Sequence, residues 1–201
     1  MNHLHINLKT SELSPHLRWN VDWNIEAGQA NWLRGPNGIG KTSLLEELKC
    51  QWPSMHPGIL LGFTDQAPLD PFQDLTVSQV FELLWDIVPE RRSIDRWQNM
   101  SEWDTEGKSL WNRPVKLLSG GENQWIKLMM MRSLKSQLWL LDEPFQFLDQ
   151  QRALVLQDWL AQWCQQGNYL IVTHHNEANF TNVKAWSLHT TSIGLAVKGS
   201  L

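Results

Sequence analysis

The feature that most constrains the fold of this chain is a glycine-rich stretch at residues 35–42, which reads GPNGIGKT. It fits the pattern G-x-x-x-x-G-K-[ST]. An apolar run at 30–33 precedes it, and leucines at helical spacing follow within 42–48, so the sequence predicts a strand, a loop and a helix in that order. In this context the backbone N–H groups of the loop converge on phosphate oxygens, and the positive end of the helix adds to their attraction. We therefore expect a phosphate-binding loop in an α/β fold.

The residues of this loop are the first candidates for contact with a nucleotide. Lys41 is expected to bridge the β- and γ-phosphates of a nucleotide, and the Thr42 hydroxyl is expected to coordinate Mg²⁺. The loop alone would fit kinases, GTPases and many other NTPases. The candidate cofactor-binding residues here are Gly35, Pro36, Asn37, Gly38, Ile39, Gly40, Lys41, Thr42 and Ser43.

The rest of the chain alternates between strand-like and helix-like patterns, which predicts a mainly parallel sheet with helices on both faces. Alternating residues within 3–24 predict two N-terminal antiparallel strands, and tryptophan-rich residues from 77 to about 116 predict a helical insertion. Further strands are expected at 59–63, 138–141 and 169–172, helices at 122–134 and 153–164, and an alternating tail at 183–197. We interpret 1–201 as one nucleotide-binding domain, with a core formed by 1–66 and 122–201 and a helical subdomain formed by 67–121.

Two acidic residues follow the apolar run 138–141. Such a strand places carboxylates at its carboxyl end, where α/β sheets hold their sites. Asp142 is predicted to contribute to the Mg²⁺ shell. Glu143, which points elsewhere, is predicted to accept a proton from the attacking water as a general base. Apolar strands often end in acids, so this motif is weak when taken alone.

A second motif, LSGGE at 118–122, stands just before the acidic strand. The Ser119 hydroxyl and the backbone N–H groups of Gly120 and Gly121, at a helix N-terminus, form a second anion site. The stretch resembles, residue for residue, the signature of the ABC (ATP-binding cassette) family. The resemblance implies a P-loop NTPase core whose helical insertion carries the signature. It also implies a two-fold dimer in which the signature of one protomer faces the phosphate loop of the other.

The resemblance extends to other positions. Gln66 is similar to the glutamine that senses Mg²⁺ and the attacking water, which implies both a catalytic and a metal-site role. Asp149, in Phe147-Leu148-Asp149, is similar to the acid at the dimer seam. His174 resembles the switch histidine that contacts the γ-phosphate, and His175 is the competing assignment. Without the family, Gln66 and His174 would be ordinary polar residues at strand ends.

The sequence also departs from the family pattern. Lys41 and Gln66 are closer in sequence than is usual, so the small β-hairpin region between them is expected to be trimmed. The aromatic residue that stacks on adenine has no clear match near Glu12 and Leu13. His16 or Trp19 could take its place.

The composition limits the kinds of molecule that this chain is expected to bind. A formal net charge of -4 lacks the basic excess of a chain that wraps nucleic acid, so no nucleic acid is expected. No apolar run approaches the roughly 20 residues that span a bilayer, so any membrane role goes through a partner. Two cysteines outside metal-ligand spacing and the absence of an export signal indicate a cytoplasmic location. The thirteen tryptophans fill a core or form an exposed docking surface.

The resemblance therefore predicts an ATPase: the ATP-binding subunit of an ABC transporter. It would form a homodimer or heterodimer around two ATP molecules with Mg²⁺ and drive transmembrane permease subunits at the inner (cell) membrane. Leu75-Thr76-Val77 resembles the start of the subdomain that meets the permease. A weaker likeness is to the haem exporter subunit of cytochrome c maturation. The alternatives are a soluble ABC ATPase acting on DNA or ribosomes, and a nucleotide-dependent switch without turnover.

Overall fold

The computed structural model describes residues 3–9, 18–87, 107–134, 136–174, 182–192 and 194–199. They form two compact units. The first consists of Met1–Asp65, Ser136–Phe145 and Gln150–Leu201, and the second of Gln66–Lys135 and Gln146–Asp149.

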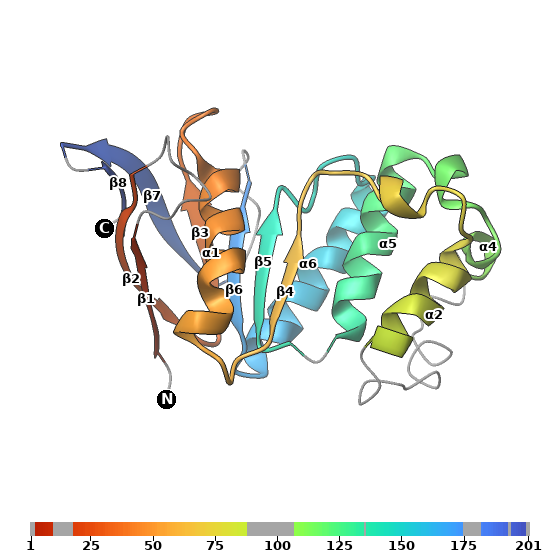
Figure 1. Ribbon diagram of the computed structural model, residues 1–201, viewed down its shortest axis with the longest axis horizontal. Coiled ribbons are helices and arrows are strands. Elements are labelled where there is room, and N and C mark those ends of the chain that lie inside the picture. The colour runs from red at the N-terminus through yellow and green to blue at the C-terminus, as the bar shows by residue number, and fades with distance from the viewer. Residues whose placement is uncertain are drawn as a thin grey trace. The chain divides into compact units, whose positions relative to one another are not determined.

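The first unit is built on a six-stranded sheet in the order β4-β5-β6-β3-β7-β8 (Figure 1). Its strands are β3 (Ala30–Arg34), β4 (Leu61–Thr64), β5 (Leu138–Asp142), β6 (Tyr169–Thr173), β7 (Val183–Thr191) and β8 (Gly194–Gly199). All neighbouring pairs are parallel except β7 and β8. The carboxyl ends of β3, β5 and β6 therefore meet at one edge.

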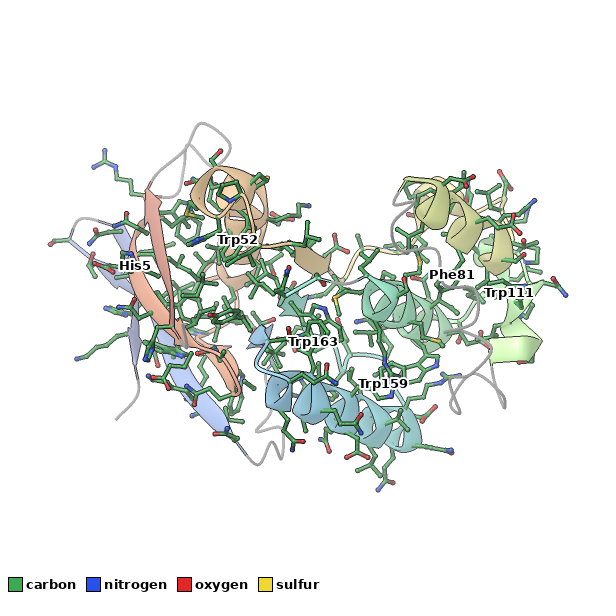
Figure 2. The ribbon with its side chains drawn as sticks, turned by 90° about the horizontal axis from the view of Figure 1, so that it is seen from below. His5, Trp52, Phe81, Trp111, Trp159 and Trp163 are labelled. Atoms are coloured by element: carbon green, nitrogen blue, oxygen red, sulfur yellow. The ribbon has the colours of Figure 1, made fainter. Side chains whose placement is uncertain are left out.

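Helices cover both faces of this sheet. Helix α1 (Lys41–Met55) contacts β4 and β5, whereas α6 (Gln150–Gln165) contacts β3 and β6. Figure 2 shows α1, with Trp52, on one face and α6, with Trp159 and Trp163, on the other. Strand β5 is buried throughout, which explains its unbroken apolar run, because parallel strands covered on both faces lose the usual alternation.

A separate antiparallel pair, β1 (His3–Lys9) and β2 (Asn20–Glu26), completes the unit. Here buried and exposed residues alternate along β2, as the sequence predicts for a sheet with one solvated face. The buried side chains of both strands join the core that also contains Leu44 and Leu48 of α1.

Most of the described tryptophans lie in the interior. The Trp139 and Trp163 rings stack at 4.0 Å, and the Trp52 indole donates to the Ile59 carbonyl at 2.8 Å. Core filling is therefore the correct interpretation for the buried ones, whereas Trp97 and Trp103 lie outside the described residues. The buried tryptophans are Trp19, Trp23, Trp32, Trp52, Trp125, Trp139 and Trp159.

The second unit is mainly helical. It contains α2 (Val77–Ile87), α4 (Lys108–Trp111), α5 (Gly120–Ser133) and the 3-10 turns η1 (Asp70–Phe72) and η4 (Val115–Leu117). The rings of Phe81 and Trp111, labelled in Figure 2, stack at 5.5 Å and join α2 to α4. None of the helices within the described ranges is long and apolar enough to cross a membrane.

The observed division differs from the predicted one at α5. The prediction ended the helical subdomain at residue 121 and placed 122 onward in the core, whereas contacts assign α5 to the helical unit. The physical reason is that α5 packs against α2. The fold class is confirmed: a mainly parallel sheet with antiparallel N-terminal strands and a helical part that carries the LSGGE motif.

Candidate functional site

The glycine-rich loop connects β3 to α1, as predicted. Gly38 and Gly40 have φ values of 77° and 105°, which a residue with a Cβ rarely adopts. Gly40 is the N-cap of α1, where no side chain caps the helix and the first turn contains no acidic residue. The first N–H groups of a helix have no intrahelical acceptor. This helix end therefore presents donors and positive potential that suit a phosphate.

Lys41 is the first residue of α1, and its side chain contacts the loop. Its Nζ donates to the carbonyl oxygens of Gly35 at 2.8 Å and Pro36 at 3.2 Å, and the residue is buried. The loop carbonyls thus hold the ammonium beside the same glycines whose N–H groups are expected to meet phosphate.

Thr42 and Asp142, two of the three predicted metal ligands, come from distant parts of the chain and meet at the carboxyl edge of the sheet. The Thr42 hydroxyl donates to Asp142 Oδ2 at 2.8 Å. The other carboxylate oxygen of Asp142 accepts from the Thr173 hydroxyl at 2.6 Å. Hydroxyl and carboxylate oxygens are hard donors of the kind that Mg²⁺ prefers, so these residues fit that ion.

Glu143 follows in an unusual backbone conformation. Its φ of 48° lies in the left-handed region, which costs a non-glycine residue about 1 kcal/mol. The Glu143 N–H donates to the Thr173 hydroxyl oxygen at 2.9 Å and helps to hold this conformation. The change of direction after Asp142 separates the two carboxylates, which gives them different neighbours.

His174 contacts the Glu143 carboxylate, as Nδ1 and Oε2 are 3.1 Å apart. Both side chains are largely buried. The ring of Phe145 lies against the imidazole with centroids 5.2 Å apart. The structure therefore brings together Thr42, Asp142, Glu143 and His174 in a continuous series of hydrogen bonds, with Thr173 as the bridge.

The sequence did not identify Thr173, Phe145 or Trp32 as residues of the site, although each contacts a predicted site residue. The Trp32 indole donates to the His174 carbonyl at 3.1 Å. A signal existed for Thr173, because a polar residue ends the apolar run 169–172 at the same edge of the sheet. Nothing in the sequence pattern marked Trp32, since its partner lies on a distant segment.

In the second unit the signature motif begins α5. The Ser119 hydroxyl oxygen accepts from the Glu122 N–H at 3.2 Å, and Glu122 Oε2 accepts from the Ser119 N–H at 2.7 Å, which together form a capping box. Arg113 donates to Glu122 at 2.7 Å. Partial burial acts to raise the pKa of Glu122, but the Ser119 N–H and hydroxyl and the Arg113 guanidinium outweigh it and hold that pKa below its ordinary value.

Gln66, Gly120 and Asp149, also predicted, are exposed, and Gly121 is half-buried. Gln66 lies two residues beyond β4, and Asp149 directly precedes α6. Phe147 has a φ of 66° and lies beside Gly120. His175, the candidate adenine neighbour His16, and the expected position of the aromatic near Glu12 and Leu13 lie outside the described residues. The other candidate, Trp19, is buried.

Known proteins share both the sequence pattern and the fold. The ABC transporter family profile matches residues 19–146. The chain is 30% identical over 171 residues to the cytochrome c biogenesis ATP-binding export protein CcmA of Pseudomonas syringae pv. tomato, covering 78% of this chain and 80% of that protein. It is 30% identical over 160 residues to the protein of the same name from Paracoccus denitrificans, covering 77% and 73%.

Solved structures agree on the fold. An ATP-binding subunit of an ABC transporter superimposes with a TM-score of 0.75 at 16% identity, covering 94% of this chain and 86% of that one. A metal-chelate type ABC transporter in an inward-facing conformation gives a TM-score of 0.70 at 21% identity, covering 98% and 83%. Since the family profile spans more than half of the sequence, this chain belongs to the ABC transporter family, as an ATP-binding subunit of the kind that couples ATP hydrolysis to transport.

Proposed function

We propose that the carboxyl edge of the six-stranded sheet, together with the loop before α1, is where this subunit binds and hydrolyses Mg-ATP. The observation that carries the proposal is the hydrogen-bonded series from Thr42 through Asp142, Thr173 and Glu143 to His174, which begins at an uncapped helix N-terminus.

The loop and the first turn of α1 bind the phosphates in this proposal. The N–H groups of residues 38–43 and the Lys41 ammonium neutralise the negative charge, with Gly35 and Pro36 orienting that ammonium. Thr42 and Asp142, which already share a hydrogen bond, would hold Mg²⁺ with oxygen ligands. When bound, the ion offsets charge on the phosphate oxygens.

Glu143 and His174 act on the reaction itself. The buried Glu143 carboxylate accepts the proton of the attacking water, and His174 contacts the γ-phosphate. Their mutual contact at 3.1 Å orients both side chains before the substrate arrives. General-base catalysis of this kind contributes about 10²- to 10⁴-fold.

The second anion site acts on another copy. Ser119, Gly120 and Gly121 of one protomer contact the nucleotide held by the phosphate loop of the other, and Asp149 lies at that seam. The active form is a homodimer or a heterodimer with a second ABC subunit, with two shared nucleotides. One domain, residues 1–201, supplies both surfaces.

The dimer drives permease subunits in the membrane from its cytoplasmic face. Because the relatives described above are named as cytochrome c biogenesis ATP-binding export proteins, we assign this chain to export in that process. Copurification from membranes with a permease of such a system supports the assignment. Copurification with ribosomes or DNA instead would contradict it.

The central test is Glu143→Gln. This variant keeps the size of the side chain but removes the base, so we expect ATP hydrolysis to fall by about 10²-fold or more while ATP binding persists. The ATP-bound dimer should then accumulate in size-exclusion chromatography with saturating Mg-ATP. A variant that hydrolyses ATP at the wild-type rate, or that remains a monomer with ATP bound, would contradict the proposal.

A further inference from the structure

We infer that Trp32 is a positioning residue for His174, and that its indole N–H fixes where the imidazole meets the γ-phosphate. The inference rests on the proposed function, because it assigns Trp32 a role that acts only through His174.

The contact extends the pairing of two strands. β3 and β6 are parallel neighbours (Figure 1), and their ladder ends with Leu33 opposite Thr173. His174 lies one residue beyond the last residue of β6. The Trp32 Nε1 donates to the His174 carbonyl oxygen at 3.1 Å, so a side chain continues the connection where the backbone ladder stops.

This hydrogen bond restrains the main chain of His174, whereas the other contacts restrain its ring. Glu143 and Phe145 both touch the imidazole. The reach of a side chain depends on where its backbone lies, and a carbonyl without a partner is free to turn toward water. Loss of the indole donor would therefore let the main chain of His174 move, and the imidazole would move with it.

The indole is itself held in place. Trp32 is only 4% exposed, and the Arg34 guanidinium lies over its ring at 3.9 Å from the centroid. Such cation–π contacts fix the plane of a ring. Arg34 directly precedes Gly35, so Trp32 contacts both the residue before the phosphate loop and the backbone of His174. A phenylalanine at this position would fill the core but would not hold His174.

The test measures how well the protein distinguishes ATP from ADP. We would determine the dissociation constants of Mg-ADP and a non-hydrolysable Mg-ATP analogue by calorimetry in wild type, Trp32→Phe, His174→Ala and the double variant. Loss of one hydrogen bond predicts that Trp32→Phe lowers the preference for the triphosphate by about threefold to tenfold. The same substitution should produce no further loss in His174→Ala, because the two residues act as one unit.

Trp139→Phe is the matched control. It also removes a buried indole that donates a hydrogen bond, but the acceptor is Ser136, at 2.9 Å, and not His174. The nucleotide preference should stay within about twofold of wild type. Circular dichroism checks that each variant folds. If Trp32→Phe does not, benzothienylalanine at position 32 retains the two-ring shape and removes only the N–H.

Three results would overturn the inference: an unchanged preference in folded Trp32→Phe, an equal loss in Trp139→Phe, or a full additional loss in the His174→Ala background. A wild-type protein that binds neither nucleotide would instead overturn the proposed function, and one that binds both equally would overturn the contact of His174 with the γ-phosphate. The two failures are therefore separable.

Discussion

Helices α1 and α5 both begin at glycine-rich motifs, yet their first turns are satisfied in different ways. α1 begins after Gly40 with no side-chain cap and no acidic residue in its first turn. α5 begins after Ser119, which forms a capping box with the acidic Glu122. An uncapped helix end leaves its donors for a ligand, whereas a capped end has already bound an anion of its own. Of these two helices, α1 therefore has no side-chain acceptor for its first N–H groups, whereas the capping box of α5 satisfies the N–H groups of Ser119 and Glu122.

The capping box does not remove α5 from consideration as an anion site. The Ser119 hydroxyl oxygen accepts the Glu122 N–H, so its own proton is still available to a phosphate oxygen. Gly120 is exposed. The N-terminus of α5 is thus a pre-formed anion site that is weaker than the phosphate loop at α1. Such a site suits a surface that contacts a nucleotide bound mainly by the phosphate loop of another copy.

The largest expected effect is a loss of ATP affinity on substitution of Lys41, which supplies the positive charge at the uncapped N-terminus of α1. Lys41→Ala removes the ammonium that the Gly35 and Pro36 carbonyls orient, so ATP affinity should fall on the order of 100-fold. Calorimetry with Mg-ATP measures the change. Lys116→Ala, in the other unit, removes an exposed charge and serves as the control. An unchanged dissociation constant in Lys41→Ala would refute its role.

A smaller loss of ATP affinity is expected when an acidic residue is introduced into the first turn of α1, where α5 has Glu122. Ser43 occupies the third position of α1, as Glu122 does in α5. Ser43→Glu would place a carboxylate beside the phosphate loop and lower ATP affinity by about 10-fold through like-charge repulsion. Ser43→Gln has nearly the same shape without the charge. If both variants bind ATP alike, the charge at this helix end does not decide affinity.

At α5 the cap and the anion contact can be separated by two substitutions. Ser119→Ala should lower ATP turnover by about 10-fold, because a hydrogen bond to a charged group is lost, while the affinity of the monomer stays the same. Ser119→Asp retains a cap acceptor but adds a negative charge. Thermal unfolding should show the Asp variant as stable as wild type, and its turnover should be the lowest. Full turnover in Ser119→Asp would leave Ser119 with a capping role alone.

The smallest expected effect concerns stability. The pKa of Glu122 is lower in the folded protein than in the unfolded chain, so the charged carboxylate stabilises the fold above its unfolded pKa. This contribution disappears as pH falls through the lowered folded pKa. Glu122→Gln should therefore destabilise the protein by about 1 kcal/mol at neutral pH and by much less in acid. Denaturant unfolding of both proteins across pH measures the difference, and a gap that is constant with pH would contradict this account.

Patterns along the chain predicted most of the strands and helices of the core, because neighbouring residues largely decide whether a segment forms a strand, a loop or a helix. The apolar run 138–141 predicted β5, and the GPNGIGKT stretch predicted the loop before α1. The C-terminal end of α1 was harder to predict, because the helix continues through Pro53 to Met55, well beyond the leucine pattern at 42–48. Tertiary packing of the buried Trp52 supports this last turn.

Residue types at fixed spacing were enough to specify two anion-binding motifs, an acidic strand end and an α/β core. That Thr173 joins Asp142 to Glu143, and that Trp32 donates to His174, depended on how the strands are arranged in space. Those contacts arise when parallel strands from distant segments bring their ends to one edge of a sheet. Residue spacing along the chain contains no record of strand order, and the strand order decides which side chains meet.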